Sequence, residues 1–354
     1  MKKTLIILAL LGLLASYLVP MFMKASENTE APFAFGFKDN LAIKYGQVVN
    51  VPIVVSGDVK ELTVTLNGKI LQKFNHPKEK LSLSIDSKNH QIGAYELELQ
   101  GLDVQGQFFT EIRNVRILSD IKPERWNLEI VQRFPHNQTS FTQGLAFSGD
   151  QLYEGTGDPS ENGSTFVGKI ELKSGEIGEK IGLDASHFGE GITILGDELF
   201  QLTWMNRKCL VYNKNTLKST RELSYTTEGW GICTDGKLLY MSDGSERIYV
   251  RNPKNFQIIK TIEVYTNEMA VTRLNELEYV NGLIYANIWT SNEVAVIDPL
   301  TGKVIALIDA TNLVNEGKGS GEVLNGIAYH PSTEKLYMTG KFWPALFEVK
   351  VRKK

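Results

Sequence analysis

Glu190 is the strongest candidate in this sequence for general acid–base chemistry. It lies between two glycines in the segment Phe188-Gly-Glu-Gly191, two residues after an aromatic side chain. A carboxylate packed among aromatic rings loses hydration, so its charged form is disfavoured and its pKa rises toward the working pH. Such a group can accept a proton at one step of a reaction and return it at another. The flanking glycines let backbone and substrate approach closely.

Other polar and aromatic residues in comparable contexts complete a candidate pocket. A pocket of tryptophans that also carries carboxylates, amides and a lysine suits a small, partly polar ligand. The polar candidates are Gln143, Asn275, Glu276 and Lys341, and the aromatic candidates are Phe141, Phe188, Trp204, Trp230 and Trp289.

Cysteine and histidine spacing excludes the common zinc motifs. Cys209 and Cys233 are the only cysteines and form no CxxC pair, and the five histidines form no HExxH motif. No thiolate zinc site can therefore be built, and a histidine site would need convergence over long range. We expect the two cysteines to be buried apolar side chains; a disulfide between them is the alternative.

Composition excludes further classes of function. Lys+Arg number 38 and Asp+Glu 41, so the net charge is -3, and there is no basic surplus of the kind that nucleic-acid binders carry. The 31 glycines and 11 prolines indicate many turns and favour a β-rich chain.

Internal repeats supply the elements that would position the candidate residues. Related strand–turn–strand stretches begin at Gly144, Gly191, Gly231, Glu276 and Gly326. They recur at intervals of about 40 to 50 residues, as propeller blades do. Each is followed by a third strand, and all but the last by a fourth.

The missing fourth strand of the last repeat has a counterpart earlier in the chain. The segment Leu128-Glu-Ile-Val-Gln-Arg-Phe134 resembles the fourth strands of the other units. This arrangement is typical of a closed propeller in which the first strand completes the last blade. The sequence therefore predicts an all-β fold with a five-bladed β-propeller over residues 126–354, and the candidate residues lie at or near one mouth of its channel. For the tryptophans the alternative is packing between blades, and for Glu276 it is hydrogen bonding to backbone amides.

The N-terminal part predicts export and an additional domain. Lys2 and Lys3 precede an apolar run from Leu5 to Met23, which indicates a signal peptide or an uncleaved signal anchor over residues 1–26 and an extracytoplasmic (periplasmic or secreted) protein. Residues 27–120 alternate in polarity over roughly seven short strands, which favours a small immunoglobulin-like β-sandwich acting as spacer or docking domain. Ser119–Glu124 reads as the linker.

The propeller segment resembles a known enzyme family. The motifs are FTQGL at Phe141, FGEGIT at Phe188, LTW ending at Trp204, EGWG at Glu228, LNELEY at Leu274, NIW ending at Trp289 and LNGIAY at Leu324. In order and spacing they resemble the plant and bacterial type of glutaminyl-peptide cyclotransferase. The resemblance implies a five-bladed propeller that needs no zinc, although a structural calcium ion of unassigned ligands is compatible with it. It also implies substrates with an N-terminal glutamine, which is converted to pyroglutamate with release of ammonia.

On this resemblance, Glu190 would shuttle a proton from the α-amine to the departing nitrogen. Gln143, Asn275 and Lys341 would position the substrate or stabilise charge on its carbonyl oxygen, and Glu276 would bind the substrate amine. Trp204, Trp230 and Trp289 would form the walls, with Phe141 and Phe188 behind them.

Two other functions fit the same fold. A non-catalytic extracytoplasmic propeller would bind a peptide or a protein partner. A propeller hydrolase such as a lactonase would need a metal ion, for which Glu190, Asn275, Glu276 and Asn325 are the conceivable ligands.

Overall fold

The computed structural model describes residues 30–38, 40–158 and 165–353, and the predicted leader at 1–26 lies outside these ranges. Within them the regular secondary structure is almost entirely β-strand. The exceptions are a 3-10 turn, η1 (Ser87–Asn89), and a short helix, α2 (Thr311–Gly317). Neither is long and apolar enough to cross a membrane, nor is any other helix of the described chain.

The N-terminal strands form two sheets. One has three strands in the order β1-β3-β6, and the other five in the order β2-β8-β7-β4-β5. Asn67 and Gly68 both have positive φ and make the predicted tight turn between β4 and β5. The structure has eight strands where the sequence predicted about seven: β1 (Phe33–Phe35), β2 (Leu41–Lys44), β3 (Val48–Val55), β4 (Val59–Leu66), β5 (Lys69–Asn75), β6 (Lys80–Asp86), β7 (Gly93–Asp103) and β8 (Phe108–Leu118).

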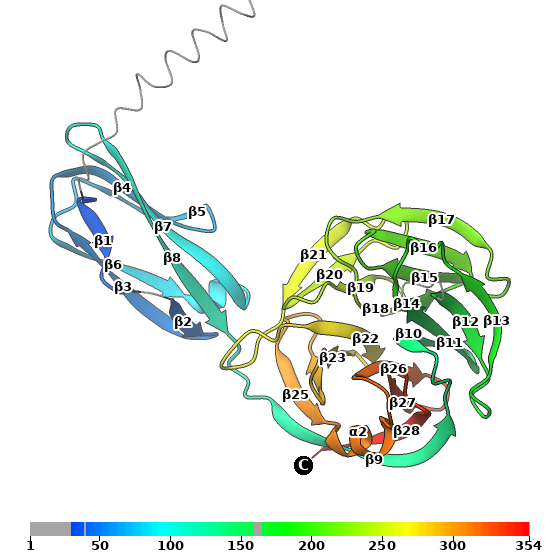
Figure 1. The fold of residues 1–354 in the computed structure, drawn as a ribbon. Helices are drawn as coiled ribbons and strands as arrows, with labels where there is room; N and C mark the ends of the chain where they lie inside the picture. The colour runs from blue at the N-terminus through cyan, green and yellow to red at the C-terminus, as the bar shows by residue number, and fades with distance from the viewer. Residues whose placement is uncertain (1–29, 39, 159–164, 354) are drawn as a thin grey trace, which may run out of the picture. The chain divides into compact units, whose positions relative to one another are not determined.

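The remaining strands form the five predicted blades of a propeller (Figure 1). The first three blades are separate four-stranded antiparallel sheets in sequence order. They comprise β10 (Phe141–Ser148), β11 (Gln151–Gly157), β12 (Phe166–Ile170) and β13 (Ile177–Gly182); β14 (Gly189–Leu195), β15 (Glu198–Thr203), β16 (Lys208–Asn213) and β17 (Ser219–Ser224); and β18 (Ile232–Thr234), β19 (Leu239–Ser242), β20 (Arg247–Arg251) and β21 (Ile258–Glu263).

The fourth and fifth blades confirm the predicted closure. The fourth comprises β22 (Leu274–Val280), β23 (Leu283–Ile288), β24 (Glu293–Ile297) and β25 (Val304–Asp309), and the fifth comprises β26 (Leu324–His330), β27 (Lys335–Gly340), β28 (Ala345–Lys353) and β9 (Glu124–Pro135). β9 pairs antiparallel with β28 from Ala345↔Pro135 to Lys353↔Trp126. β9 begins at Glu124, two residues before the predicted start of the propeller at residue 126. Its first residues pair in parallel with β25, and this pairing joins the fourth and fifth blades into one sheet.

Glycines let the inner strands of neighbouring blades approach closely. The inner strands β10, β14, β18, β22 and β26 contact one another in a ring. A Cβ at Gly144, Gly191 or Gly231 would lie less than 3.0 Å from backbone atoms of the next inner strand. The repeat glycine is therefore required by backbone packing around the channel.

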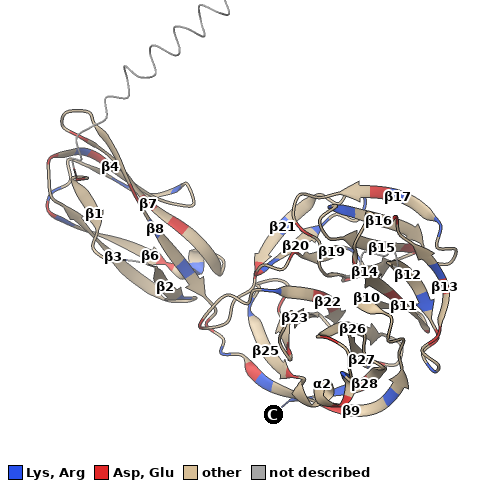
Figure 2. Ribbon diagram, viewed as in Figure 1, with Lys and Arg blue, Asp and Glu red and all other residues tan. Residues whose placement is uncertain are grey.

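Apolar side chains from facing blades fill the space between them, and both cysteines belong to these layers. Cys209 packs with Phe200 and Ile232, and Cys233 packs with Leu277 among others. Both are buried free thiols whose pKa is raised by burial. The prediction that they are buried apolar side chains is therefore confirmed, and the alternative disulfide is not formed. Charges of both signs are interspersed over the strands (Figure 2), with pairs such as Arg221–Glu198.

Candidate active site

A cavity of about 390 Å³ receives side chains from all five blades. Three of its polar residues lie on inner strands: Gln143 on β10, Glu190 on β14 and Asn275 on β22. Others follow the ends of second strands, which run antiparallel and so reach the same mouth. Its full lining is Phe141, Gln143, Asp158, Phe188, Glu190, Trp204, Trp230, Asn275, Trp289, Glu322 and Lys341. The structure thus brings together every predicted site residue except Glu276.

Irregularities in the inner strands aim these side chains into the cavity. The register shifts between Thr142 and Gly144, which brackets Gln143, and between Gly189 and Ile192, which brackets Glu190. A further shift between Leu274 and Leu277 brackets Asn275. An extra residue at such a bulge breaks strict alternation and re-aims its side chain, a device common beside active sites.

The aromatic residues form two adjoining walls. Phe188 makes edge contacts with Phe141 and Trp204, at centroid distances of 6.1 and 5.7 Å, and Trp230 and Trp289 make one at 5.6 Å. Trp204 is 39% exposed and Trp289 is 40% exposed. Their faces are therefore open to a ligand, which distinguishes them from tryptophans packed between blades.

Glu228 joins the two walls, a role that the sequence analysis missed although it quoted the residue within EGWG. Its Oε2 atom accepts a hydrogen bond from Nε1 of Trp204 at 2.8 Å and from Nε1 of Trp230 at 2.9 Å. One carboxylate oxygen thus fixes the rotamers of two indoles.

Glu190 and Lys341 are the buried ionisable pair of the cavity. Glu190 is 5% exposed, and the groups that act on its carboxylate are Lys341 and Glu228, neither through a hydrogen bond. Burial raises the pKa of Glu190 well above its usual range, Lys341 partly opposes this and Glu228 adds to it. Burial lowers the pKa of Lys341, against the opposing influence of Glu190 and Glu322. Burial thus acts on both pKa values in the direction that favours the neutral form.

Lys341 also contacts an aromatic wall, and two amides beside it have free polar atoms. The ammonium of Lys341 lies 4.3 Å from the centroid of the Phe141 ring. Gln143 Oε1 accepts a 3.3 Å hydrogen bond from Asn325, which leaves its NH2 group for a ligand. Asn275 Oδ1 is buried without a partner in the described structure. A ligand can satisfy both amides.

Glu276 differs from its predicted role. Its carboxylate is outside the cavity lining and accepts hydrogen bonds from the backbone N–H groups of Leu145 and Ile327, at 3.4 and 3.0 Å. It therefore connects inner strands of three blades across the channel, which is the alternative that the sequence left open. Asn275 and Glu276 lie together at the bulge of β22, where only Asn275 reaches the cavity.

Two acidic residues of the cavity were not predicted. Asp158 directly follows β11, and Glu322 lies two residues before β26. Asp158 has the same position after a second strand as Trp204, Trp289 and Lys341, so the repeat pattern carried a signal for it that was not used; Glu322 has no such equivalent. Trp343 does not line the cavity, unlike the tryptophans of the two walls described above. It is fully buried and donates from Nε1 to the Glu322 carbonyl at 3.0 Å.

The ligands required by a metal-dependent hydrolase do not converge. Glu190 and Asn275 line the cavity, whereas Glu276 and Asn325 lie outside its lining and Glu276 bonds backbone N–H groups. Across the described residues, no three His, Cys, Asp or Glu side chains are grouped to hold an ion.

Comparisons with known proteins point to one family. A family model described as "Glutamine cyclotransferase" matches residues 107–351, so the match includes β8 as well as the propeller. The glutaminyl-peptide cyclotransferase of Arabidopsis thaliana is 36% identical over 231 residues, which are 64% of this chain and 71% of that protein. The crystal structure of Myxococcus xanthus glutaminyl cyclase matches with a TM-score of 0.62 and 34% identity, covering 66% of this chain and all of that one.

Proposed function

The chain belongs to the glutamine cyclotransferase family and is a glutaminyl-peptide cyclotransferase, and from this premise we propose that Glu190 is its proton shuttle. The observation that carries the proposal is a carboxylate, 5% exposed, that lines the cavity and whose pKa is raised well above its usual range by burial. A carboxyl group with a raised pKa can accept and return a proton near neutral pH.

The reaction joins two ends of one residue. The free α-amine of an N-terminal glutamine attacks its own side-chain carbonyl carbon, and a new C–N bond closes the five-membered ring. The bond from that carbon to the amide nitrogen then breaks. One proton must move from the attacking nitrogen to the leaving nitrogen so that ammonia departs. Ionised Glu190 accepts that proton and then donates it.

Ring closure requires a folded-back substrate, and the walls supply it. Holding the two reacting ends together contributes much of the acceleration in an intramolecular reaction. The rings of Trp204, Trp230 and Trp289 are open to the cavity and pack on the methylene groups of the substrate, with Phe141 and Phe188 behind them.

Charge that develops on the carbonyl oxygen needs donors. The Lys341 ammonium and the free NH2 group of Gln143 supply them, since both line the cavity. Asn275 also lines the cavity, and its side-chain amide positions the substrate.

Two further proposals concern the N-terminal part. The lysines and apolar run of residues 1–26 support export, either as a cleaved signal peptide or as a membrane anchor, and N-terminal sequencing of the exported protein distinguishes the two. The two sheets of residues 33–118 support an immunoglobulin-like sandwich that acts as a spacer or docking domain.

The test is ammonia release from a short peptide that begins with glutamine, with and without a chelator. We expect release in both, and none from the same peptide acetylated at its α-amine. Glu190→Gln should lower kcat by about 100-fold or more, the usual contribution of a proton-transfer group. The matched control is Glu278→Gln, which changes another enclosed glutamate on β22 whose burial raises its pKa to about 8 but which lies outside the cavity lining. Full activity of a folded Glu190→Gln variant would remove Glu190 from the mechanism.

A further inference from the structure

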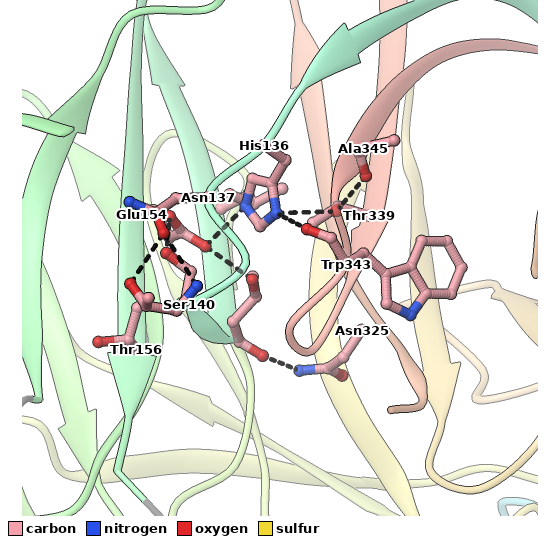
Figure 3. Close-up of polar contacts among 12 residues, drawn as sticks. His136, Asn137, Ser140, Glu154, Thr156, Asn325, Thr339, Trp343 and Ala345 are labelled. Atoms are coloured by element: carbon pink, nitrogen blue, oxygen red, sulfur yellow. Dashed lines mark hydrogen bonds and ion pairs between the residues drawn. The ribbon is translucent and has the colours of Figure 1, made fainter. Parts of the chain in front are cut away.

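A buried histidine and glutamate form the centre of a polar network beside the cavity (Figure 3). His136, between β9 and β10, is 7% exposed, and Glu154 on β11 is fully buried. His136 Nε2 lies 3.1 Å from Glu154 Oε1, and its Nδ1 lies 2.8 Å from the Trp343 carbonyl oxygen. Neither side chain lines the cavity, and the proposed reaction does not use them.

The partners fix one proton between His136 and Glu154. A carbonyl oxygen only accepts, so Nδ1 carries a hydrogen and donates to Trp343. The Thr339 hydroxyl, 3.5 Å from Nδ1, uses its own hydrogen on the Ala345 carbonyl. Nε2 and Oε1 would repel each other through lone pairs if both lacked a hydrogen. One proton therefore lies between them, shared by the imidazole and the carboxylate.

The same glutamate holds the segment that enters β10. Ser140 donates from Oγ to Glu154 Oε2 at 3.0 Å, and Thr142 donates from Oγ1 to Oε1 at 2.6 Å. Ser140 and Thr142 flank Phe141, and Gln143 follows. Glu154 thus determines the path of the backbone that presents both cavity residues.

The same histidine holds the turn that follows β27. The Trp343 carbonyl accepts from the imidazole, and the backbone N–H of His136 donates to the Pro344 carbonyl at 3.2 Å. Phe342 closes the connection, because its N–H donates to the Ser140 carbonyl at 2.8 Å. This turn begins at Lys341, whose ammonium lies over the ring of Phe141.

We infer that His136 and Glu154 are positioning residues that lock the turn bearing Lys341 against the segment bearing Phe141 and Gln143. The lock spans the junction of the first and last blades, where the ring closes. The inference rests on the proposed roles of Lys341 and Gln143 in the reaction.

The charge surroundings make the lock dependent on pH. Glu154 is the one charged group acting on His136 in the described structure; the other neighbours, from β10, β27 and the turn, are hydroxyls and carbonyls. Burial alone would lower the pKa of His136, but Glu154 and the Trp343 carbonyl outweigh burial and raise it. A raised histidine pKa means that the stabilisation is fully present below the unfolded-state pKa and is lost as the pH rises through the folded-state pKa. The lock therefore loosens as the pH rises through the folded-state pKa of His136.

Two substitutions of Glu154 separate positioning from bulk structure. Glu154→Ala removes the partner of three side chains, and we expect kcat/KM to fall roughly 10- to 100-fold in a folded protein, as small misplacements of catalytic groups do. Glu154→Gln retains two contacts of the network without charge, because its NH2 donates to a neutral imidazole and its oxygen accepts from Ser140; the Thr142 hydroxyl must then rotate to accept from the same NH2. We expect near wild-type kcat/KM at neutral pH, with the alkaline limb of the pH profile moved to higher pH.

The control is a second histidine–carboxylate pair between the same two blades. His330 Nε2 lies 3.1 Å from Asp150 Oδ1, at the opposite end of β26 from the cavity. We expect Asp150→Ala to change kcat/KM by less than about twofold, because distant sites act independently. Ser140→Ala serves if Glu154→Ala does not fold.

These outcomes test the positioning role of His136 and Glu154 separately from the proposed role of Glu190. Full activity of Glu154→Ala or of Ser140→Ala, an equal loss in Asp150→Ala, or an unmoved alkaline limb in Glu154→Gln would overturn the positioning role. Failure of the proposed chemistry looks different, because Glu190→Gln would then retain activity whatever the variants of Glu154 do.

Discussion

Replacing Glu228 by alanine should lower kcat/KM for an N-terminal glutamine peptide without unfolding the propeller. The Glu228 carboxylate accepts the indole N–H groups of both Trp204 and Trp230, so its removal frees two walls of the cavity at once. Hydrogen bonds to charged groups contribute about 1.5–3 kcal/mol each when enclosed, and water competes for part of this at a site where Trp204 is 39% exposed. With about 1 kcal/mol for each bond, the loss is about 2 kcal/mol, or roughly 30-fold in kcat/KM.

Glu228→Gln separates the hydrogen bonds from the charge. The amide oxygen still accepts from both indoles, so kcat/KM at the pH optimum should stay within about fivefold of wild type, the loss being that of charge assistance. The negative charge of Glu228 helps to raise the pKa of Glu190. Without it that pKa falls, and since the shuttle must be ionised to accept a proton, the acid limb of the profile should move to lower pH.

The assay is ammonia release across a pH series, with thermal unfolding measured on each variant. Glu222→Ala is the control, because Glu222 is an exposed glutamate on β17, the strand that precedes Glu228, and its ion pair with Lys208 lies on the surface. The reasoning fails if Glu228→Ala remains within twofold of wild type, or if the acid limb of Glu228→Gln does not move.

Two more predictions concern the cavity. Trp289→Ala removes a 40% exposed ring and its edge contact with Trp230, so kcat/KM should fall roughly 10-fold while the melting temperature changes little. Steady-state kinetics measure the first effect and a thermal melting curve measures the second. A peptide with N-terminal glutamate adds a carboxylate to a cavity that already holds Asp158, Glu190 and Glu322 with one lysine, Lys341. At pH 8 it should therefore form pyroglutamate far more slowly than a glutamine peptide does, and the difference should be smaller at pH 6, where more of the substrate carboxylate is protonated. Mass spectrometry of the product measures both rates.

The propeller could be predicted from the sequence because each blade repeats a strand–turn–strand pattern, which begins at a glycine in four of the five blades. Closure through β9 was predicted because the last repeat lacks a fourth strand and an additional strand precedes the first repeat. The pairing of β9 with β28 confirms it. The glycines at 144, 191 and 231 were recognised by position alone; their reason is backbone contact between inner strands, which no local pattern reveals.

The site was predictable to the extent that its residues lie at equivalent points of the repeats. Glu190 and Asn275 do, and both line the cavity. Glu276 was misassigned because it was placed in the same pocket as Asn275, although consecutive residues of a strand point to opposite faces; its carboxylate turns to backbone N–H groups instead. Glu228 was missed because its importance arises from two indoles that only the fold brings to one oxygen atom.

The position of the cavity also explains why closure of the propeller by β9 and catalysis are linked in this fold. Lys341 belongs to the last blade and Gln143 to the first, so these two donors meet only where β9 completes the ring. An error in that closure would separate the donors while leaving Glu190, inside the second blade, in place. The His136–Glu154 pair lies at this junction, with hydrogen bonds to both of the segments that must meet. A propeller that binds its ligand within one blade would have no need of such a lock.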